Sequence, residues 1–194
     1  MTKETSSSLN SPAKFQVPRL VALIGFMGAG KTTVGQALAT RLRWQFVDLD
    51  DLIQGRARRS IPTIFEESGE AGFRELERQI LREIVISSSP EATVLSLGGG
   101  AFIDNTNQRL LRENEIVTVF LDASAEELFR RCAQPGVLRP LLRDVRHFRA
   151  LFDERRPAYL KASHCVQTTG REIESIVDEI ISRLALETSV GVSK

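Results

Sequence analysis

The stretch Gly25–Thr32, which reads GFMGAGKT, decides the fold of this 194-residue chain. It matches G-x-x-x-x-G-K-[ST], a pattern in which backbone N–H groups of a glycine-rich turn surround phosphate oxygens. The apolar run 20–24 precedes it, and a helical pattern with apolar residues at 34, 38 and 42 follows it. This strand, turn and helix are the context that the motif requires, and they disfavour the alternative of an ordinary glycine-rich turn. The Lys31 ammonium can then reach the β- and γ-phosphates, and the Thr32 hydroxyl can bind Mg²⁺.

Outward from this loop, short apolar runs alternate with helical patterns. Further strands are predicted over 44–47, 93–97, 116–121 and 165–167. A helical stretch opens at 60–62 and stops at Gly69, and the next has an apolar face at 73, 76, 80 and 84. Ser124 and Glu127 predict a capping box, and an apolar stripe predicts a last helix over 173–184. The alternation predicts an α/β fold with a five-stranded parallel sheet flanked by helices, and ligands at the carboxyl ends of the strands.

Composition limits the class of protein. A net charge of +1 from 26 basic and 25 acidic residues gives no support to a nucleic-acid or anionic-membrane surface. Two cysteines 33 residues apart and two histidines make a Cys/His metal site improbable and fit reduced thiols in the cytoplasm. No run approaches the roughly 18 apolar residues of a membrane span. We expect a disordered tail over 1–18 and a single domain over 19–194.

The phosphate motif indicates a nucleotide but not a reaction. The N-K-x-D motif of GTPases does not occur in the chain, and larger motor or transport ATPases need a longer one. A small kinase with a P-loop kinase fold fits best, and such an enzyme needs an acceptor site and a movable cover.

Two acidic residues follow the predicted second strand. In an extended segment Asp48 and Asp50 point to the same side, so both can face the phosphate loop. Asp48 would then lie near Mg²⁺ with Thr32, and Asp50 could orient an acceptor hydroxyl or take its proton. The alternatives are a pair of solvated loop acids or a helix cap, and Asp51 is itself a candidate cap.

Three other features are candidates for substrate recognition. Arg74 can bind a carboxylate through two hydrogen bonds, although a surface arginine paired with Glu70 or Glu77 is the simpler interpretation. The triple glycine at 98–100 brings bare backbone to a ligand, or is merely a flexible loop. The arginine-rich segment 130–147 suits a mobile lid over phosphates, or is a solvated basic loop.

Together these motifs resemble the shikimate kinase family. The resemblance rests on GFMGAGKTTVG at 25–35, DLD at 48–50, IPTIFEESGEAGFRELE at 61–77, GGG at 98–100, RPLL at 139–142 and RRPAY at 155–159. It covers about residues 20–185, in order and with similar spacing. It implies transfer of the γ-phosphoryl group of ATP to the 3-hydroxyl of shikimate, a step toward chorismate and the aromatic amino acids.

The resemblance also implies roles for individual residues. The carboxylate of Asp50 contacts the acceptor hydroxyls, Arg74 and Arg155 bind the shikimate carboxylate, and Mg²⁺ lies at Thr32 and Asp48. Arg139 comes from the lid, expected at about 130–147, and reaches the phosphates. The residues expected to be catalytic are Lys31, Asp50 and Arg139. Those expected at ATP are Gly28, Ala29, Gly30, Lys31, Thr32, Thr33, Arg131 and Arg139. Those expected at shikimate are Asp50, Arg74, Gly98, Gly99, Gly100 and Arg155.

Some assignments stay open at the level of sequence. The family's R-x-P-L-Y reads RRPAY here, with Ala158 in place of leucine, which leaves Arg155 and Arg156 as alternatives; the register against Pro157 favours Arg155. Arg131 is a candidate for adenine contact, and Arg171 is a weaker one. The chain is expected to be a monomer. A kinase for another polyol acid, such as gluconate, and a non-catalytic nucleotide-binding relative are the rival functions; the presence of Lys31, Asp50 and Arg139 disfavours the second.

Overall fold

The fold is built around a five-stranded parallel sheet. The structure is a computed structural model that describes residues 18–87, 91–133 and 144–186. The strands are β1 (Leu20–Ile24), β2 (Gln45–Asp48), β3 (Thr93–Ser96), β4 (Val117–Asp122) and β5 (His164–Gln167), in the order β2-β3-β1-β4-β5. Every neighbouring pair is parallel. The bounds lie within one residue of those predicted from sequence, which confirms the α/β fold. The expected tail lies almost entirely outside the described residues.

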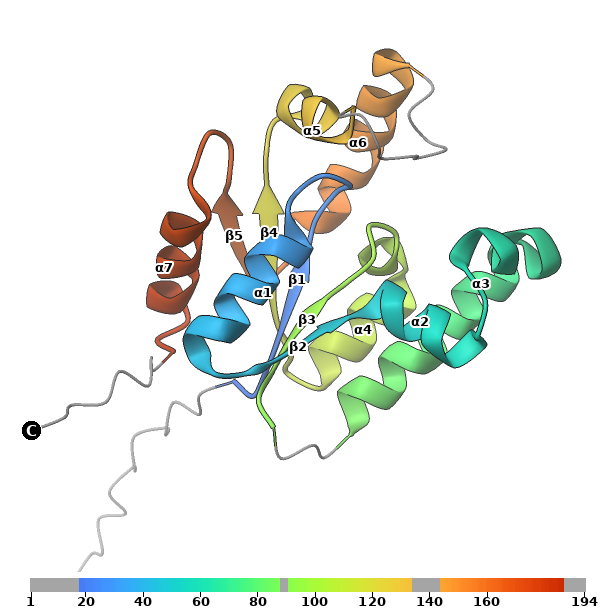
Figure 1. The fold of residues 1–194 in the computed structure, drawn as a ribbon, viewed down its shortest axis with the longest axis horizontal. Coiled ribbons are helices and arrows are strands. Elements are labelled where there is room, and N and C mark those ends of the chain that lie inside the picture. Colours follow the sequence, from blue (N-terminus) through green and yellow to red (C-terminus); the bar gives the residue numbers. More distant parts are fainter. Residues whose placement is uncertain (1–17, 88–90, 134–143, 187–194) are drawn as a thin grey trace, which may run out of the picture.

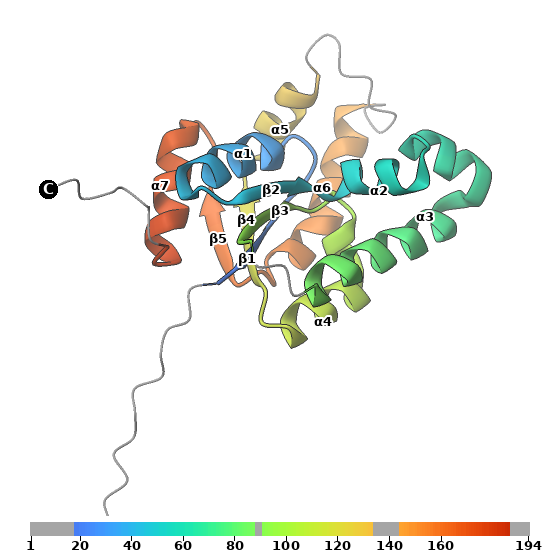
Figure 2. The same ribbon diagram turned by 60° about the horizontal axis from the view of Figure 1, so that its bottom comes forward.

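Helices cover both faces of this sheet. Figure 2 shows α1 (Lys31–Leu42) and α7 (Ile173–Arg183) on one side, with α4 (Asn105–Glu113) and α6 (Val145–Tyr159) on the other. The short helix α2 (Leu49–Ala57) and the long α3 (Ile61–Ile86) form a projecting arm, and α5 (Ala125–Cys132) lies above the carboxyl ends of the strands (Figure 1). Because β1 is central and covered on both faces, Val21, Ala22, Leu23 and Ile24 are all buried.

One local sequence signal is confirmed and another is confirmed in part. Gly69 was expected to end a helix, and its non-helical backbone, with φ 67° and ψ −178°, divides α3 into two helical stretches at a kink. Ser124 caps α5 by accepting a hydrogen bond from the Glu127 N–H. The reciprocal half of the predicted capping box is absent, because the Glu127 carboxylate binds Arg131 and the Gly170 N–H.

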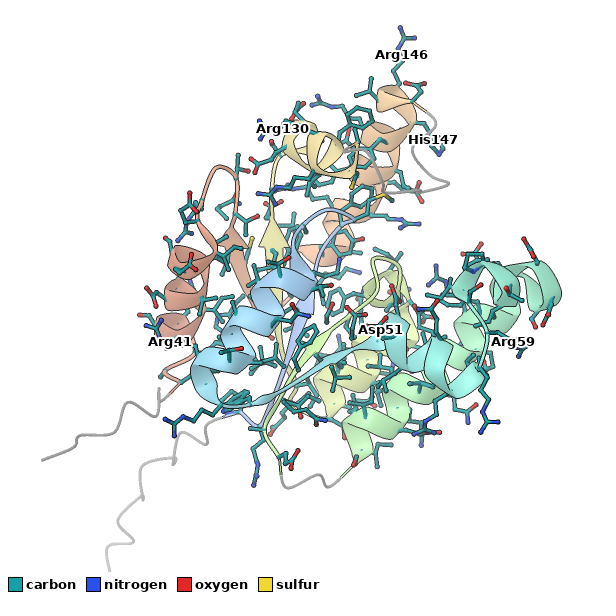
Figure 3. The ribbon with its side chains drawn as sticks, in the orientation of Figure 1. Arg41, Asp51, Arg59, Arg130, Arg146 and His147 are labelled. Atoms are coloured by element: carbon teal, nitrogen blue, oxygen red, sulfur yellow. The ribbon has the colours of Figure 1, made fainter. Side chains whose placement is uncertain are left out.

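The expected lid spans parts of two helices. Residues 130–132 end α5 and residues 145–147 begin α6, while 134–143 lie outside the described residues. Arg130 and Arg146 are exposed and point away from the sheet (Figure 3). Among the described residues, no helix combines the length and the apolar character needed to cross a membrane.

Candidate active site

The phosphate loop lies between β1 and α1, as the motif predicts. Gly28 and Gly30 have φ values of 79° and 85°, a conformation that suits glycine, and Gly30 caps α1 without a side-chain hydrogen bond. The first turn of α1 thus presents its N–H groups and its positive dipole end to an anion. A cavity of about 730 Å³ opens here, and residues 27–34 all line it.

The Lys31 side chain folds back over this loop. Its Nζ donates hydrogen bonds to the carbonyl oxygens of Gly25, at 2.9 Å, and Phe26, at 3.2 Å. These contacts hold the ammonium at the mouth of the loop, where it adds positive charge to the backbone N–H groups. Lys31 therefore lies at the phosphate loop, and its contact with the β- and γ-phosphates stays a prediction.

Thr32 and Asp48 form the pair of oxygen ligands expected for a magnesium ion. The Thr32 hydroxyl donates to Oδ2 of Asp48 at 3.1 Å, across the gap between α1 and β2. One hydroxyl and one carboxylate suit Mg²⁺, which keeps several waters and takes its remaining ligands from substrate phosphates. No group of three or more His, Cys, Asp or Glu that could hold a metal occurs among the described residues.

The helix cap after β2 is Asp48, and the extended geometry expected for 48–50 is wrong. Asp48 is the N-cap of α2, and its Oδ1 accepts from the Asp50 N–H at 3.1 Å. Asp50 therefore lies in the first turn of a helix, and Asp51, the other candidate cap, is exposed (Figure 3). Both Asp48 and Asp50 nevertheless line the cavity, because the capped turn directs both carboxylates toward the phosphate loop.

The surroundings of Asp50 suit a proton acceptor. Burial raises the pKa of its carboxyl, the nearby Asp48 carboxylate raises it further, and Lys31 acts in the opposite direction. The carboxylate lies directly against the triple glycine: a Cβ on Gly98 would be 2.5 Å from Oδ1 of Asp50. A side chain at position 98 would therefore displace this carboxylate.

Arg74 meets the other end of the triple glycine. A Cβ on Gly100 would be 2.5 Å from Nη2 of Arg74, so a side chain here would displace the guanidinium. The guanidinium also binds Glu77, at 2.9 Å, and lies 3.5 Å from Glu70. The ion pairs named as the alternative therefore exist. They hold the guanidinium at the glycine segment, so the pairing and a role in recognition are compatible.

Arg155 and Arg156 are the two candidates for binding the substrate carboxylate, and they have different partners in the structure. Arg156 binds the buried Asp122 carboxylate at the end of β4, with Nη2 2.6 Å from Oδ2. Arg155 instead lies beside the hydroxyl of Tyr159, a residue that contacts Gly99. Arg156 has a structural partner, and Arg155 is the one near the glycine segment.

The other predicted residues fall into two groups. Nη1 of Arg131 lies 3.4 Å from the Gly28 carbonyl, and both Arg131 and Arg171 line the cavity at its far end. Arg139 lies outside the described residues. Sequence reasoning missed Glu172, Ile173 and Ile176 as cavity residues. The two isoleucines carried only the signal of a core-facing stripe, and Glu172 carried none.

Comparisons with known proteins agree with this site. A family model described as shikimate kinase matches residues 27–185. The chain belongs to the shikimate kinase family. A shikimate kinase from Salinibacter ruber is 41% identical over 84% of this chain and 83% of its own length. Family membership makes the chain an ATP-dependent phosphotransferase whose alcohol acceptor is shikimate.

Solved structures of shikimate kinases resemble this chain more than a solved gluconokinase does. A shikimate kinase from Acinetobacter baumannii in complex with shikimate has a TM-score of 0.78 and 32% identity, covering 91% of this chain and 98% of its own. A gluconokinase from Sinorhizobium meliloti has a TM-score of 0.58 and 18% identity, over 88% and 93% of the two chains. The second likeness is one of fold alone, so it does not support the gluconate alternative.

Proposed function

We propose that this shikimate kinase family member transfers the γ-phosphoryl group of ATP to the 3-hydroxyl of shikimate, giving shikimate 3-phosphate and ADP. This product leads toward chorismate and the aromatic amino acids. One observation carries the assignment: the triple glycine joins two charged side chains, Asp50 at Gly98 and Arg74 at Gly100, beside the phosphate loop. The hydroxyls of shikimate match the carboxylate of Asp50, and the single carboxylate of shikimate matches the guanidinium of Arg74.

The nucleotide half of the site consists of the phosphate loop and its neighbours. The backbone of residues 28–33 surrounds the β- and γ-phosphates, and Lys31 reaches the transferring group. Arg131 contacts the nucleotide at the far end of the cavity, with Arg171 as the alternative. Arg139 adds a positive charge at the transferring phosphoryl group, a role that the family resemblance implies.

Magnesium fits the pair formed by Thr32 and Asp48. The 3.1 Å contact between the two side chains brings a hydroxyl and a carboxylate oxygen together beside the loop, and these two atoms would hold the ion. A bound Mg²⁺ would neutralise negative charge on the nucleotide phosphates.

In the acceptor half, Arg74 and Arg155 bind the carboxylate of shikimate while Asp50 and the backbone of 98–100 bind its hydroxyls. Asp50 accepts the proton of the 3-hydroxyl as that oxygen attacks the γ-phosphorus. The bond from this phosphorus to the bridging oxygen of ADP breaks, and ADP leaves with the electron pair. Positioning and charge neutralisation provide most of the rate enhancement in such transfers.

The remaining proposals concern the domain organisation, the oligomeric state, the location and the partners of the protein. A single domain over 19–194, with a lid at about 130–147, acts as a monomer in the cytoplasm, without a nucleic-acid or membrane partner. The near-neutral net charge of +1 disfavours a nucleic-acid or anionic-membrane partner.

A coupled assay of ADP release with Mg-ATP tests the acceptor directly. Shikimate, quinate and gluconate are compared at equal concentration. Turnover with shikimate alone is expected, because Arg74 and the glycine segment suit a compact cyclic acid. Turnover with gluconate alone would contradict the proposal. The Asp50→Asn variant is the control for contaminating ATPase activity.

A further inference from the structure

Tyr159 is a buried residue with no role assigned so far. It is the last residue of α6, and its side chain is completely inaccessible to solvent. Its hydroxyl donates a hydrogen bond to the carbonyl oxygen of Gly99, which lies sixty residues earlier in the chain. The ring packs on Phe120 of β4, with 5.4 Å between the ring centroids. Tyr159 thus joins α6 to the middle glycine of the triple glycine.

Gly99 occupies a critical position in the site. A Cβ on it would lie 3.8 Å from the Met27 nitrogen and 3.9 Å from the Gly25 carbonyl oxygen, so its backbone lies against the phosphate loop. Its two neighbours are the glycines that contact Asp50 and Arg74. A restraint on the Gly99 carbonyl therefore sets the distance between the acceptor segment and the phosphate loop.

A second interaction, an ion pair, fixes the C-terminal end of α6. Arg156 binds Asp122, whose carboxylate also accepts from Nε2 of Gln167 at 2.9 Å. Arg155, the residue before Arg156, lies beside the Tyr159 hydroxyl. Burial raises the pKa of Tyr159 to about 12, against the lowering effect of Arg155, so the phenol keeps its proton and stays a donor at neutral pH.

We propose that Tyr159 is a positioning residue for the acceptor: through the Gly99 carbonyl, its hydroxyl holds the triple glycine and Arg155 in one fixed arrangement. This inference rests on the roles proposed above for 98–100 and Arg155. Tyr159 does not touch the reacting atoms, and its effect on the reaction passes through the backbone of Gly99.

The Tyr159→Phe variant removes the hydroxyl and keeps the ring on Phe120. We expect the KM for shikimate to rise about tenfold and kcat to fall several-fold, because small misplacements of a substrate are costly in rate. The KM for Mg-ATP should stay within twofold of the wild-type value, because Lys31 and the loop backbone keep their own contacts. This contrast between the two substrates is what a merely structural role would not produce.

Thr118→Val provides a matched control. Thr118 is buried at the opposite end of β4, and its hydroxyl accepts from the Ser163 N–H at 2.9 Å. Both substitutions therefore remove one buried hydroxyl and leave one backbone group without its partner. Thr118→Val should lower the melting temperature to a similar extent and leave both KM values unchanged.

Three outcomes would overturn the inference: unchanged constants in Tyr159→Phe, equal changes in the KM for both substrates, or the same rise in KM for shikimate in Thr118→Val. Arg74→Ala belongs in the same series. If Arg74→Ala raises the KM for shikimate and Tyr159→Phe does not, the proposed acceptor site stands and the positioning role fails. If neither variant raises it, the acceptor site itself has been misassigned.

Discussion

Asp50 and Asp51 are adjacent carboxylates with opposite surroundings. Asp50 lines the cavity against Gly98, whereas Asp51 is exposed. We expect Asp50→Asn to lower kcat by about 10²–10⁴-fold, because an amide cannot accept the acceptor's proton. ATP binding, measured by calorimetry, should persist.

Asp51→Asn is the control for this prediction. It removes the same charge one residue away, outside the cavity, and should keep wild-type turnover. A kcat for Asp50→Asn that equals the wild-type value would show that Asp50 is neither the base nor a group that orients the acceptor.

The role proposed for Arg74 is in binding shikimate rather than in the chemical step. We expect Arg74→Ala to raise the KM for shikimate by about 30- to 150-fold, which corresponds to about 2–3 kcal/mol for lost charge-assisted hydrogen bonds. Steady-state kinetics with shikimate as the varied substrate measure this change. Because Glu77 is 1% exposed and loses its partner in this variant, thermal unfolding must be measured as well.

Arg78→Ala is the matched control for Arg74. Arg78 lies about one turn further along α3 and binds Glu75 and Asp104 instead. Its removal should leave the KM for shikimate unchanged. If both variants raise this KM equally, the effect belongs to α3 as a whole and Arg74 is a surface arginine.

At the scale of elements, the close packing of α5 under the phosphate loop depends on Gly28. A Cβ at this position would lie 2.7 Å from Sγ of Cys132 and 3.0 Å from the Leu128 carbonyl oxygen, and φ is +79°. We expect Gly28→Ala to destabilise the fold by more than the roughly 1–2 kcal/mol of left-handed strain and to weaken ATP binding. Urea unfolding and calorimetry measure the two effects.

Gly55→Ala is the matched control for Gly28→Ala. Gly55 lies inside α2 with nothing within 4 Å of its would-be Cβ. Alanine there should stabilise the chain by about 0.5–1 kcal/mol, as expected for a helix interior. A Gly28→Ala variant that matches this gain would refute the packing argument.

Asp104 joins α3 to α4. Its carboxylate accepts from the Thr106 N–H at 2.7 Å, as the cap of α4, and from Arg78 at 2.9 Å. Burial raises the pKa of Asp104, but the hydrogen bonds outweigh it and leave the pKa below its ordinary value. Its charge therefore stabilises the fold above the ordinary aspartate pKa, and this stability is lost as the pH falls through the lowered value.

Thermal unfolding of Asp104→Asn across a pH series tests this sign. The amide keeps a capping oxygen without the charge, so the variant should melt below wild type at pH 7. The gap should narrow as the pH falls below about 4. Asp104→Ala also loses the cap, at a further cost of about 0.5–2 kcal/mol, and a gap independent of pH would contradict the assignment.

The elements also show what sequence patterns can and cannot predict. Every strand was found to within one residue. The central strands β1, β3 and β4 are buried and largely apolar, as parallel strands covered on both faces are, whereas the edge strands β2 and β5 are only partly buried. Helix α6 was not predicted, because it is rich in arginine and contains Pro157. The geometry of 48–50 was predicted wrongly, because the choice between extended chain and capped helix depends on a single hydrogen bond to the Asp50 N–H.

At the scale of the whole molecule, sequence motifs identify candidate site residues but not the contacts between them. The phosphate loop, Asp50 and Arg74 stand out by residue type and motif. The bonds from Tyr159 to Gly99 and from Arg156 to Asp122 join residues far apart in sequence and leave no periodic pattern. The role of Arg139 stays a prediction.

The proposed monomer has a physical basis at this scale. Among the described residues, the exposed large apolar side chains are Phe65 and Ile86 on α3 and Val145 and Leu160 at the two ends of α6. Scattered apolar residues of this kind do not build a subunit interface. Sedimentation should therefore give a mass of 21.6 kDa, independent of protein concentration. A mass that doubles at higher concentration would contradict this prediction.

The strand order β2-β3-β1-β4-β5 has a consequence for how the chain folds while it is being synthesised. The first strand to be synthesised is the central one, and Val21 pairs with Val94 on one side and Val117 on the other. In a nascent chain this apolar strand therefore keeps one edge unpaired after β3 is made, until Val117 has left the ribosome. Exposed strand edges of this kind attract aggregation and chaperones. The phosphate loop directly follows β1 and thus acquires its final surroundings only after β4 has been made.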